Sequence, residues 1–162
     1  MFEIVDSARV KAGRERCFLL ATSIALVEQT IGLKPAEGKT SGLVIGGDRL
    51  VWRGWKFGLP AMHETLITQY QRPGFFEDTM GRGRFAFFQH GHWFEEAAGE
   101  TIMRDVVRFS LPFGWAGWLV GRWIVAPHVR GLVKRRYALL KRMAETAEGD
   151  PYLQAAHPTP QR

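Results

Sequence analysis

Apolar and polar residues alternate most regularly over residues 85–110, and this period of two predicts a pair of β-strands. The stretch 96–100 interrupts the alternation and predicts the turn of an antiparallel hairpin. Side chains two residues apart on a strand point to the same face of a sheet. One face of the hairpin then carries Phe88, His90, His92 and Phe94 from the first strand and Thr101, Met103, Asp105, Val107 and Phe109 from the second.

Two histidines and one carboxylate lie on this otherwise apolar face. Opposing His90 to Asp105 keeps both sets of side chains on one face of the sheet, and it sets His92 beside Met103. Such a group is an active site, a ligand pocket, or a buried polar network that only stabilises the sheet. The apolar surroundings favour a pocket.

Further strands precede the hairpin, separated by turns too short for a crossover helix, which predicts an antiparallel meander. Opposing Asp78 to Ile67 brings Asp78 and His63 onto the face that carries the two histidines. The strand 50–57 contains Trp52 and Trp55, and the pattern does not decide which of them points inward. These further strands are predicted at 2–10, 50–57, 62–70 and 75–80.

Helical segments are expected on both sides of the meander. Two short helices are predicted at 12–21 and 23–31, the second capped by Ser23 and ended by Gly32. The stretch 34–47 is expected to be extended, with turns.

After the hairpin, residues 115–125 predict a short apolar helix. Pro127 suits the first turn of a separate amphipathic helix over 128–147. The glycine and proline at 149–151 stop this helix, so we predict one domain over 1–148 and a flexible tail over 149–162.

An apolar sheet face must be covered, and the last helix is the only element long enough to cover it. We therefore predict an α+β fold in which a curved antiparallel sheet of about six or seven strands wraps the long C-terminal helix. The two short helices after the first strand close one end. A cavity is expected between the sheet and the C-terminal helix.

Length and composition fit one globular domain, with 46% hydrophobic residues among 162. The single cysteine, Cys17, excludes an internal disulfide and is typical of a reducing compartment. The first ten residues lack the pattern of a signal peptide, and Arg122 interrupts the apolar stretch 111–127. That stretch is also shorter than the ~20 residues of a membrane span. We expect a soluble, cytoplasmic protein.

The net charge of +6 raises the question of nucleic-acid binding. The strand aromatics do not alternate with basic side chains on one face, as binding of a single strand would require. We therefore expect no nucleic-acid partner. Many of the basic residues instead belong to the last helix, where they are expected to form its solvated back: Arg130, Lys134, Arg135, Arg136, Lys141 and Arg142.

A set of short motifs spreads over nearly the whole chain, from residue 2 to about residue 147. The motifs are Thr40-Ser41-Gly42-Leu43, Trp52 with Phe57-Gly58, Phe76-x-Asp78-x-Met80-x-x-Gly83-x-Phe85, His90-x-His92-x-Phe94, Thr101-x-Met103-x-Asp105 and Pro112-x-Gly114. On these motifs the chain resembles the SRPBCC superfamily, the START-like helix-grip proteins, and within it a bacterial group labelled polyketide-cyclase-like or cell-division-inhibitor-like. The resemblance implies a helix-grip fold whose members bind, carry or convert very different ligands. The sequence Trp115-Ala116-Gly117-Trp118 departs from the group's pattern, being bulkier.

The inward polar group supports several kinds of chemistry. As a catalytic pair, His90 and Asp105 would exchange protons with a substrate in a cyclase or dehydratase, because a histidine beside a carboxylate titrates near neutrality. The group is less suitable as a metal site, because no third ligand occurs at a sequence spacing typical of metal-binding motifs. We therefore expect no metal or cofactor. As a ligand pocket it would involve Trp52, His63, Phe76, Asp78, Phe88, His92, Phe94, Met103 and Phe109.

The expected function is binding of a hydrophobic small molecule, such as a lipid, a polyketide or an aromatic compound, by a carrier or sensor. An enzyme of the cyclase or dehydratase type and a regulatory interaction protein are the alternatives. The apolar segment 115–125 has three interpretations: core packing, gating of the cavity or transient membrane contact during lipid exchange, and a homodimer surface.

Overall fold

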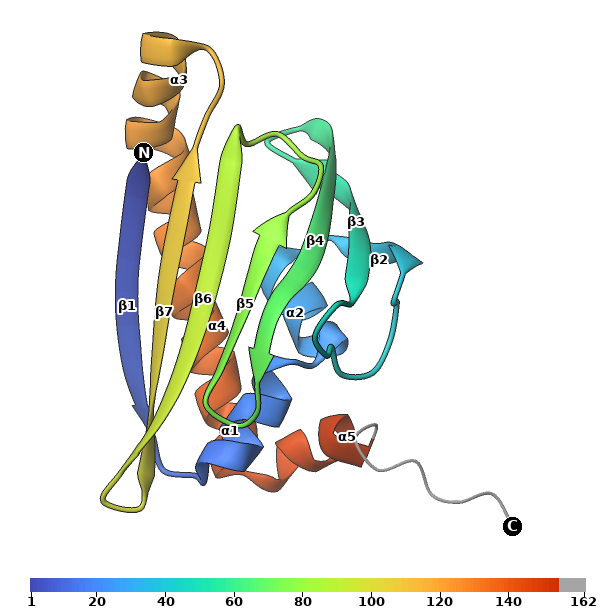
Figure 1. Cartoon of the computed structure of the whole chain (residues 1–162), viewed down its shortest axis with the longest axis vertical. Helices are drawn as coiled ribbons and strands as arrows, with labels where there is room; N and C mark the ends of the chain where they lie inside the picture. The colour runs from blue at the N-terminus through green and yellow to red at the C-terminus, as the bar shows by residue number, and fades with distance from the viewer. Residues whose placement is uncertain (155–162) are drawn as a thin grey trace.

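The computed structural model describes residues 1–154, and within them seven strands form one antiparallel sheet (Figure 1). The strands follow the order β1-β7-β6-β5-β4-β3-β2, so that the first strand pairs with the last and the others form a meander. Their bounds are β1 (Phe2–Val10), β2 (Lys34–Gly38), β3 (Arg49–Lys56), β4 (Leu59–Gln71), β5 (Phe75–Met80), β6 (Phe87–Ala97) and β7 (Glu100–Ser110).

Three helices cover one face of the sheet, and the sheet curves around the longest of them, α4 (Figure 1). This is the predicted α+β helix-grip architecture, with two short helices after the first strand. The helices are α1 (Arg14–Ala21), α2 (Ile24–Ile31), α3 (Gly114–Val120), a π-helical turn η1 (Gly121–Val125), α4 (Ala126–Glu145), a 3-10 turn η2 (Ala147–Gly149) and α5 (Asp150–Leu153).

The hairpin β6–β7 has a different register from the predicted one. His92 lies opposite Asp105 and His90 lies opposite Val107, so the predicted opposition of His90 to Asp105 is wrong. The cause is the tight turn at Ala98 and Gly99, whose φ angles are 53° and 78°. A type I′ turn needs two such positive angles, which an alanine rarely adopts. Since the register differs by two residues, every side chain keeps its predicted face.

Other details of the sheet agree with the sequence. Asp78 lies opposite Ile67, as predicted. The choice between the two tryptophans of β3 is settled by burial, because Trp52 is 2% exposed and Trp55 is 68% exposed. The strand β5 has the predicted bounds, whereas β4 begins at Leu59, inside the segment expected to turn.

The C-terminal helix is one continuous column, which corrects the prediction of two helices separated at Pro127. The π-helical turn η1 links α3 directly to α4, and Pro127 lies in the first turn of α4. A π turn moves the backbone hydrogen bonds to residues five apart. The column can therefore pass a proline that has no N–H to donate.

The start of α2 also differs from expectation. Ser23 occupies the N-cap position but makes no side-chain cap hydrogen bond. The segment around Leu43 supplies backbone partners instead, because the N–H of Ile24 donates to the carbonyl of Gly42 at 3.0 Å. Gly32 ends the helix in the left-handed conformation, with a φ of 64°, as predicted.

The core joins α1 and α4 to the inner face of the sheet. The ring of Phe18, fully buried in α1, contacts the rings of Phe76 and Phe94 edge-on. Within the segment 149–162, expected to be a tail, Tyr152 of α5 packs against this core, and residues 155–162 lie outside the described part of the chain. No helix among the described residues combines the length and the apolarity needed to cross a membrane.

Candidate functional site

A cavity of about 600 Å³ lies between the inner face of the sheet and the helices α2 and α4. Small-molecule sites typically have volumes of ~300–1,000 Å³. The cavity extends to the exposed residues Phe57 and Leu59 at the β3–β4 turn and Ile124 of η1, which form its mouth. Most of its wall is apolar and includes Leu50, Trp52 and Ile67 of the sheet and Val129, Leu132 and Val133 of α4.

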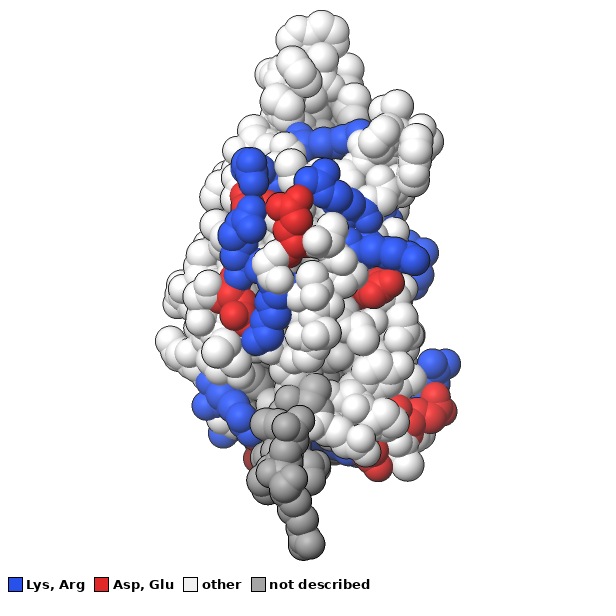
Figure 2. Space-filling model, turned by 90° about the vertical axis from the view of Figure 1, so that its right-hand side faces the viewer, with Lys and Arg blue, Asp and Glu red and all other residues white. Residues whose placement is uncertain are grey.

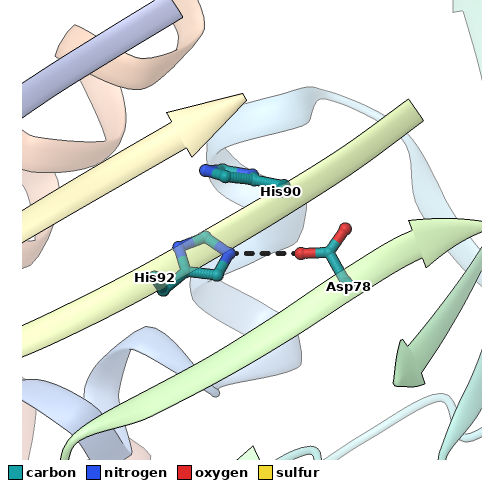
Figure 3. Close-up of side chains that lie close together, drawn as sticks. All are labelled: Asp78, His90 and His92. Carbon is teal, nitrogen blue, oxygen red and sulfur yellow. Dashed lines mark hydrogen bonds and ion pairs between the residues drawn. The ribbon is translucent and has the colours of Figure 1, made fainter. Parts of the chain in front are cut away.

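One patch of the wall is polar and is centred on His92. Its Nδ1 atom lies 3.0 Å from Asp105 Oδ1, and its Nε2 atom lies 3.1 Å from Asp78 Oδ2. Asp78 of β5 lies opposite His90 of β6, and the ring of His92, two residues along β6, points toward the Asp78 carboxylate (Figure 3). The His92 side chain is 2% exposed, so its imidazole is held between two carboxylates away from water.

His90 also lines the cavity, is more exposed than His92 and is less completely bonded. Its Nε2 atom is 3.3 Å from Asp105 Oδ2, but no hydrogen bond of acceptable geometry forms. The rings of His90 and His92 are in contact, with centroids 3.8 Å apart. Because the Nε2 atom is buried against Asp105, a ligand in the cavity would hydrogen-bond His90 through the other ring nitrogen, Nδ1.

Arg136 of α4 closes the polar patch from the helix side. Its Nη2 atom donates to the carbonyl of Ala21 at 3.1 Å, and its Nε atom lies 3.8 Å from Asp105 Oδ2. The long helix is thereby connected to both α1 and the sheet through buried charges. With Asp78 and Asp105 ionised and His92 protonated, this patch contains two negative and two positive charges, which satisfies the requirement that buried charges be paired.

The pKa values of the two histidines are shifted in opposite directions. Burial acts to lower the pKa of His92, but the carboxylates of Asp105 and Asp78 outweigh it and raise that pKa above its usual value. For His90, burial and the neighbouring charge of His92 both lower the pKa, and Asp105 does not compensate. The pKa of His63 is lowered as well, because this side chain is also buried. The two adjacent imidazoles therefore differ in basicity, and His92 keeps its proton to a higher pH than His90 does.

Both carboxylates remain ionised. Burial would raise the pKa of Asp105, but His92 and His90 hold it well below its usual range. The pKa of Asp78 is lowered for the same reasons, chiefly by its hydrogen bond with His92 against the effect of burial.

Asp78, His90 and His92 are also the group, among residues 1–154, whose ligand atoms come within 4.8 Å of one another and so could surround a metal ion. Both ring nitrogens of His92 already face carboxylates, and the charges of the patch are balanced by Arg136. A cation there would have to displace the proton that His92 shares with Asp78. The arrangement fits a closed ion-pair network better than a metal site.

Most of the residues expected in the pocket do line the cavity, and four do not. Asp105 lies behind the two histidines, so it contacts them and not the cavity; Phe94, Met103 and Phe109 belong to the core beneath α1 and α4. The sequence placed all four on the correct face, but the covering helices fill that part of the face. The residues that line the cavity are Trp52, His63, Phe76, Asp78, Phe88, His90 and His92.

Arg136 is a site residue that the sequence interpretation missed. It was expected on the solvated back of the last helix, but it is 9% exposed and lines the cavity. A signal was present, because residues 129, 133, 136, 140 and 143 follow helical spacing and all are buried. A single arginine inside an apolar stripe indicates a buried charge that has a partner.

Solved structures of low sequence identity share this fold. A protein from Chromobacterium violaceum superposes with a TM-score of 0.66 at 11% identity, covering 90% of this chain and 99% of that chain. A START superfamily protein from Mycobacterium smegmatis gives 0.62 at 10% identity, covering 88% and 97%. A major latex-like protein from Panax ginseng gives 0.55 at 8% identity, covering 82% and 93%.

No family model matches the sequence, and a search of curated proteins finds no match either. The likeness to the solved structures concerns the fold. The chain has the helix-grip fold that the resemblance of its sequence predicts.

Proposed function

We propose that the protein binds a hydrophobic small molecule in the cavity between the sheet and α4, as a carrier or sensor. The observation that supports this most directly is an open cavity of about 600 Å³ whose wall is mostly apolar, with one histidine-carboxylate patch and a few other polar side chains such as Thr65 and Lys56. An apolar pocket with a few converging polar groups is typical of small-molecule sites. The fold shared with the START superfamily protein agrees with this proposal.

The wall chemistry specifies the ligand class. The apolar part suits a lipid tail, a polyketide or an aromatic ring, and burial of such surface provides ~25 cal/mol per Å². His90 and His63, both facing the cavity, would hydrogen-bond a carbonyl or hydroxyl group at one end of the ligand. The ligand is therefore a mostly apolar molecule with one oxygen-bearing end.

The test is a titration with Nile red, a neutral apolar dye that fluoresces in dry pockets. One dye per chain is expected to bind the wild type. Val133→Phe on α4 and Ala61→Phe on β4 extend into the cavity from opposite walls and are expected to weaken binding about tenfold. Val5→Phe adds the same ring at a position on β1 that is 50% exposed and should leave binding unchanged. Equal dye binding by both filled variants would exclude the cavity as the site.

A second candidate function is acid–base catalysis of the cyclase or dehydratase type, which is favoured by the opposite pKa directions of His90 and His92. Neutral His90 would take a proton from the carbon next to a carbonyl. The same imidazole, once protonated, would return that proton to the departing hydroxyl, because both ring nitrogens of His92 face carboxylates. Asp105 would then orient both rings without touching substrate.

Catalysis and simple binding differ in the compound that the protein releases. For catalysis, a bound hydroxy-carbonyl compound is expected to leave lighter by one water molecule, and His90→Gln should stop that loss while dye binding persists. Recovery of the compound with unchanged mass from the wild type would reject the dehydratase function and leave the carrier function standing.

A further inference from the structure

A cluster of exposed apolar side chains covers the end of the molecule where α3 projects beyond the strands (Figure 1). We name it the aromatic crown. Three of its members are tryptophans, and Trp115 and Trp123 are 79% and 70% exposed. Contiguous exposed apolar surface of this kind marks an interaction site in most proteins. The crown consists of Phe113, Trp115, Trp118, Leu119, Trp123 and Ile124.

The crown is continuous with the mouth of the cavity. Val120 and Ile124 belong to the same helical column, are exposed, and also line the cavity. Across the mouth, Phe57 of the β3–β4 turn contacts the ring of His128 on α4, with centroids 5.0 Å apart. Anything that covers the crown therefore also covers the way into the cavity.

Positive charge surrounds this apolar end. Lys56 and Arg84 lie at the cavity mouth, and the guanidinium of Arg122 lies 5.3 Å from the centre of the Trp123 ring. The whole segment 111–144 contains no aspartate or glutamate. Figure 2 shows one face with an uncharged end above a belt in which lysine and arginine side chains predominate, with some acidic side chains among them.

We propose that the aromatic crown docks on the surface of an anionic lipid bilayer. Tryptophan and phenylalanine side chains insert at the boundary between headgroups and acyl chains, and nearby lysine and arginine side chains bind anionic headgroups. A second copy of the chain fits less well, because a symmetric interface would bring two belts of positive charge together. Docking presents the cavity mouth to the lipid, so an apolar ligand crosses between bilayer and cavity without entering water.

Vesicle sedimentation tests the docking with the full chain. Wild-type protein is expected to sediment with vesicles of equal parts phosphatidylcholine and phosphatidylglycerol, and about tenfold less with phosphatidylcholine alone. Replacing the exposed Trp115, Trp118 and Trp123 together by serine should abolish sedimentation. Arg122→Gln should weaken binding to the anionic vesicles only. Ile45→Ser removes an apolar side chain that is 53% exposed near the opposite end of β3, and it should change nothing.

Three results would overturn the proposal. The first is absence of wild-type sedimentation with the anionic vesicles, and the second is unchanged sedimentation of the triple variant. The third is a wild-type dimer in sedimentation velocity that the triple variant loses, without vesicle binding, which would assign the crown to self-association. Nile red titration of the same variants keeps this test separate from the cavity, because docking does not depend on a ligand being bound.

Discussion

His90 and His92 stand two residues apart on β6 and share the carboxylate of Asp105, yet their surroundings differ. His92 has a carboxylate at each ring nitrogen, which raises its pKa. His90 has one poorly aligned carboxylate, and burial together with the neighbouring His92 lowers its pKa. Their contributions to stability must therefore depend on pH in opposite ways.

Replacing each histidine by glutamine is expected to show this opposition. The raised pKa of His92 gives stability that is complete below the unfolded value of about 6.5 and disappears as the pH rises through the folded value. His92→Gln should therefore cost about 2–3 kcal/mol at low pH and less at high pH. Urea unfolding of both proteins from about pH 5, below the usual histidine pKa of about 6.5, up to about pH 9 measures the difference.

His90→Gln is expected to give the reverse slope. The pKa of His90 is lower in the folded state than in the unfolded state. Below about pH 6.5 the unfolded chain therefore binds a proton that the folded chain does not bind, and the wild type loses stability. The variant has no such loss, and its stability relative to the wild type should improve in acid. Two difference curves with the same slope would contradict this assignment of the two protonation states.

Asp105→Asn removes the charge that holds the network together. The variant is expected to be less stable by about 3 kcal/mol, because Arg136 and His92 lose their buried partner. The pKa of His92, followed by its ring nitrogen resonances in NMR, should fall. Glu95→Gln on the exposed side of β6 serves as the control and should affect neither quantity. An unchanged His92 pKa in Asp105→Asn would show that Asp105 is not its main partner.

Alternation along the chain was enough to gather His63, Asp78, His90, His92 and Asp105 on one face. It could not give their depth, because depth depends on which helix covers each part of the sheet. Asp105 was therefore expected at the cavity, but in the structure it lies behind the histidines. The pairing of His90 was wrong for a local reason, the positive φ of Ala98, which side-chain type does not reveal.

At the scale of elements, the long C-terminal column depends on a close approach at one glycine, Gly121. A Cβ atom on Gly121 would lie 2.4 Å from the ring of Phe2 on β1, whereas Gly131 in α4 has no atom within 4 Å of the same position. The sequence predicted a break at Pro127 because proline usually begins a helix. It gave no sign that a π turn at 121–125 carries the helix past that residue.

The two glycines provide a matched pair for a test. Gly121→Ala is expected to destabilise the protein by about 1–3 kcal/mol, because the added methyl group pushes against Phe2. Gly131→Ala should stabilise it by up to ~1 kcal/mol, since alanine favours a helix interior and meets no obstacle. Thermal unfolding of both variants measures the contrast. A tolerated Gly121→Ala would mean that the column does not rest against β1 in solution.

The whole molecule joins an apolar sheet face, a helix that carries one buried arginine, and a cavity that opens beside an aromatic end. Its architecture could be predicted because strand spacing, the single long amphipathic segment and the sheet's need for cover all indicate the same fold. The cavity's extent could not, because it is the space that side chains of six or more elements leave unfilled. Its ligand is not specified by any single motif.

Native mass spectrometry of the protein as purified tests the central claim, that this cavity holds a hydrophobic small molecule. The wild type is expected to carry one non-covalent apolar molecule per chain, which is released on denaturation. Val133→Phe, which fills the cavity, should be isolated without it, and Val5→Phe should retain it. A ligand carried equally by the wild type and by Val133→Phe, or a wild type that takes up no lipid, polyketide or aromatic compound after incubation with an extract of them, would contradict the account.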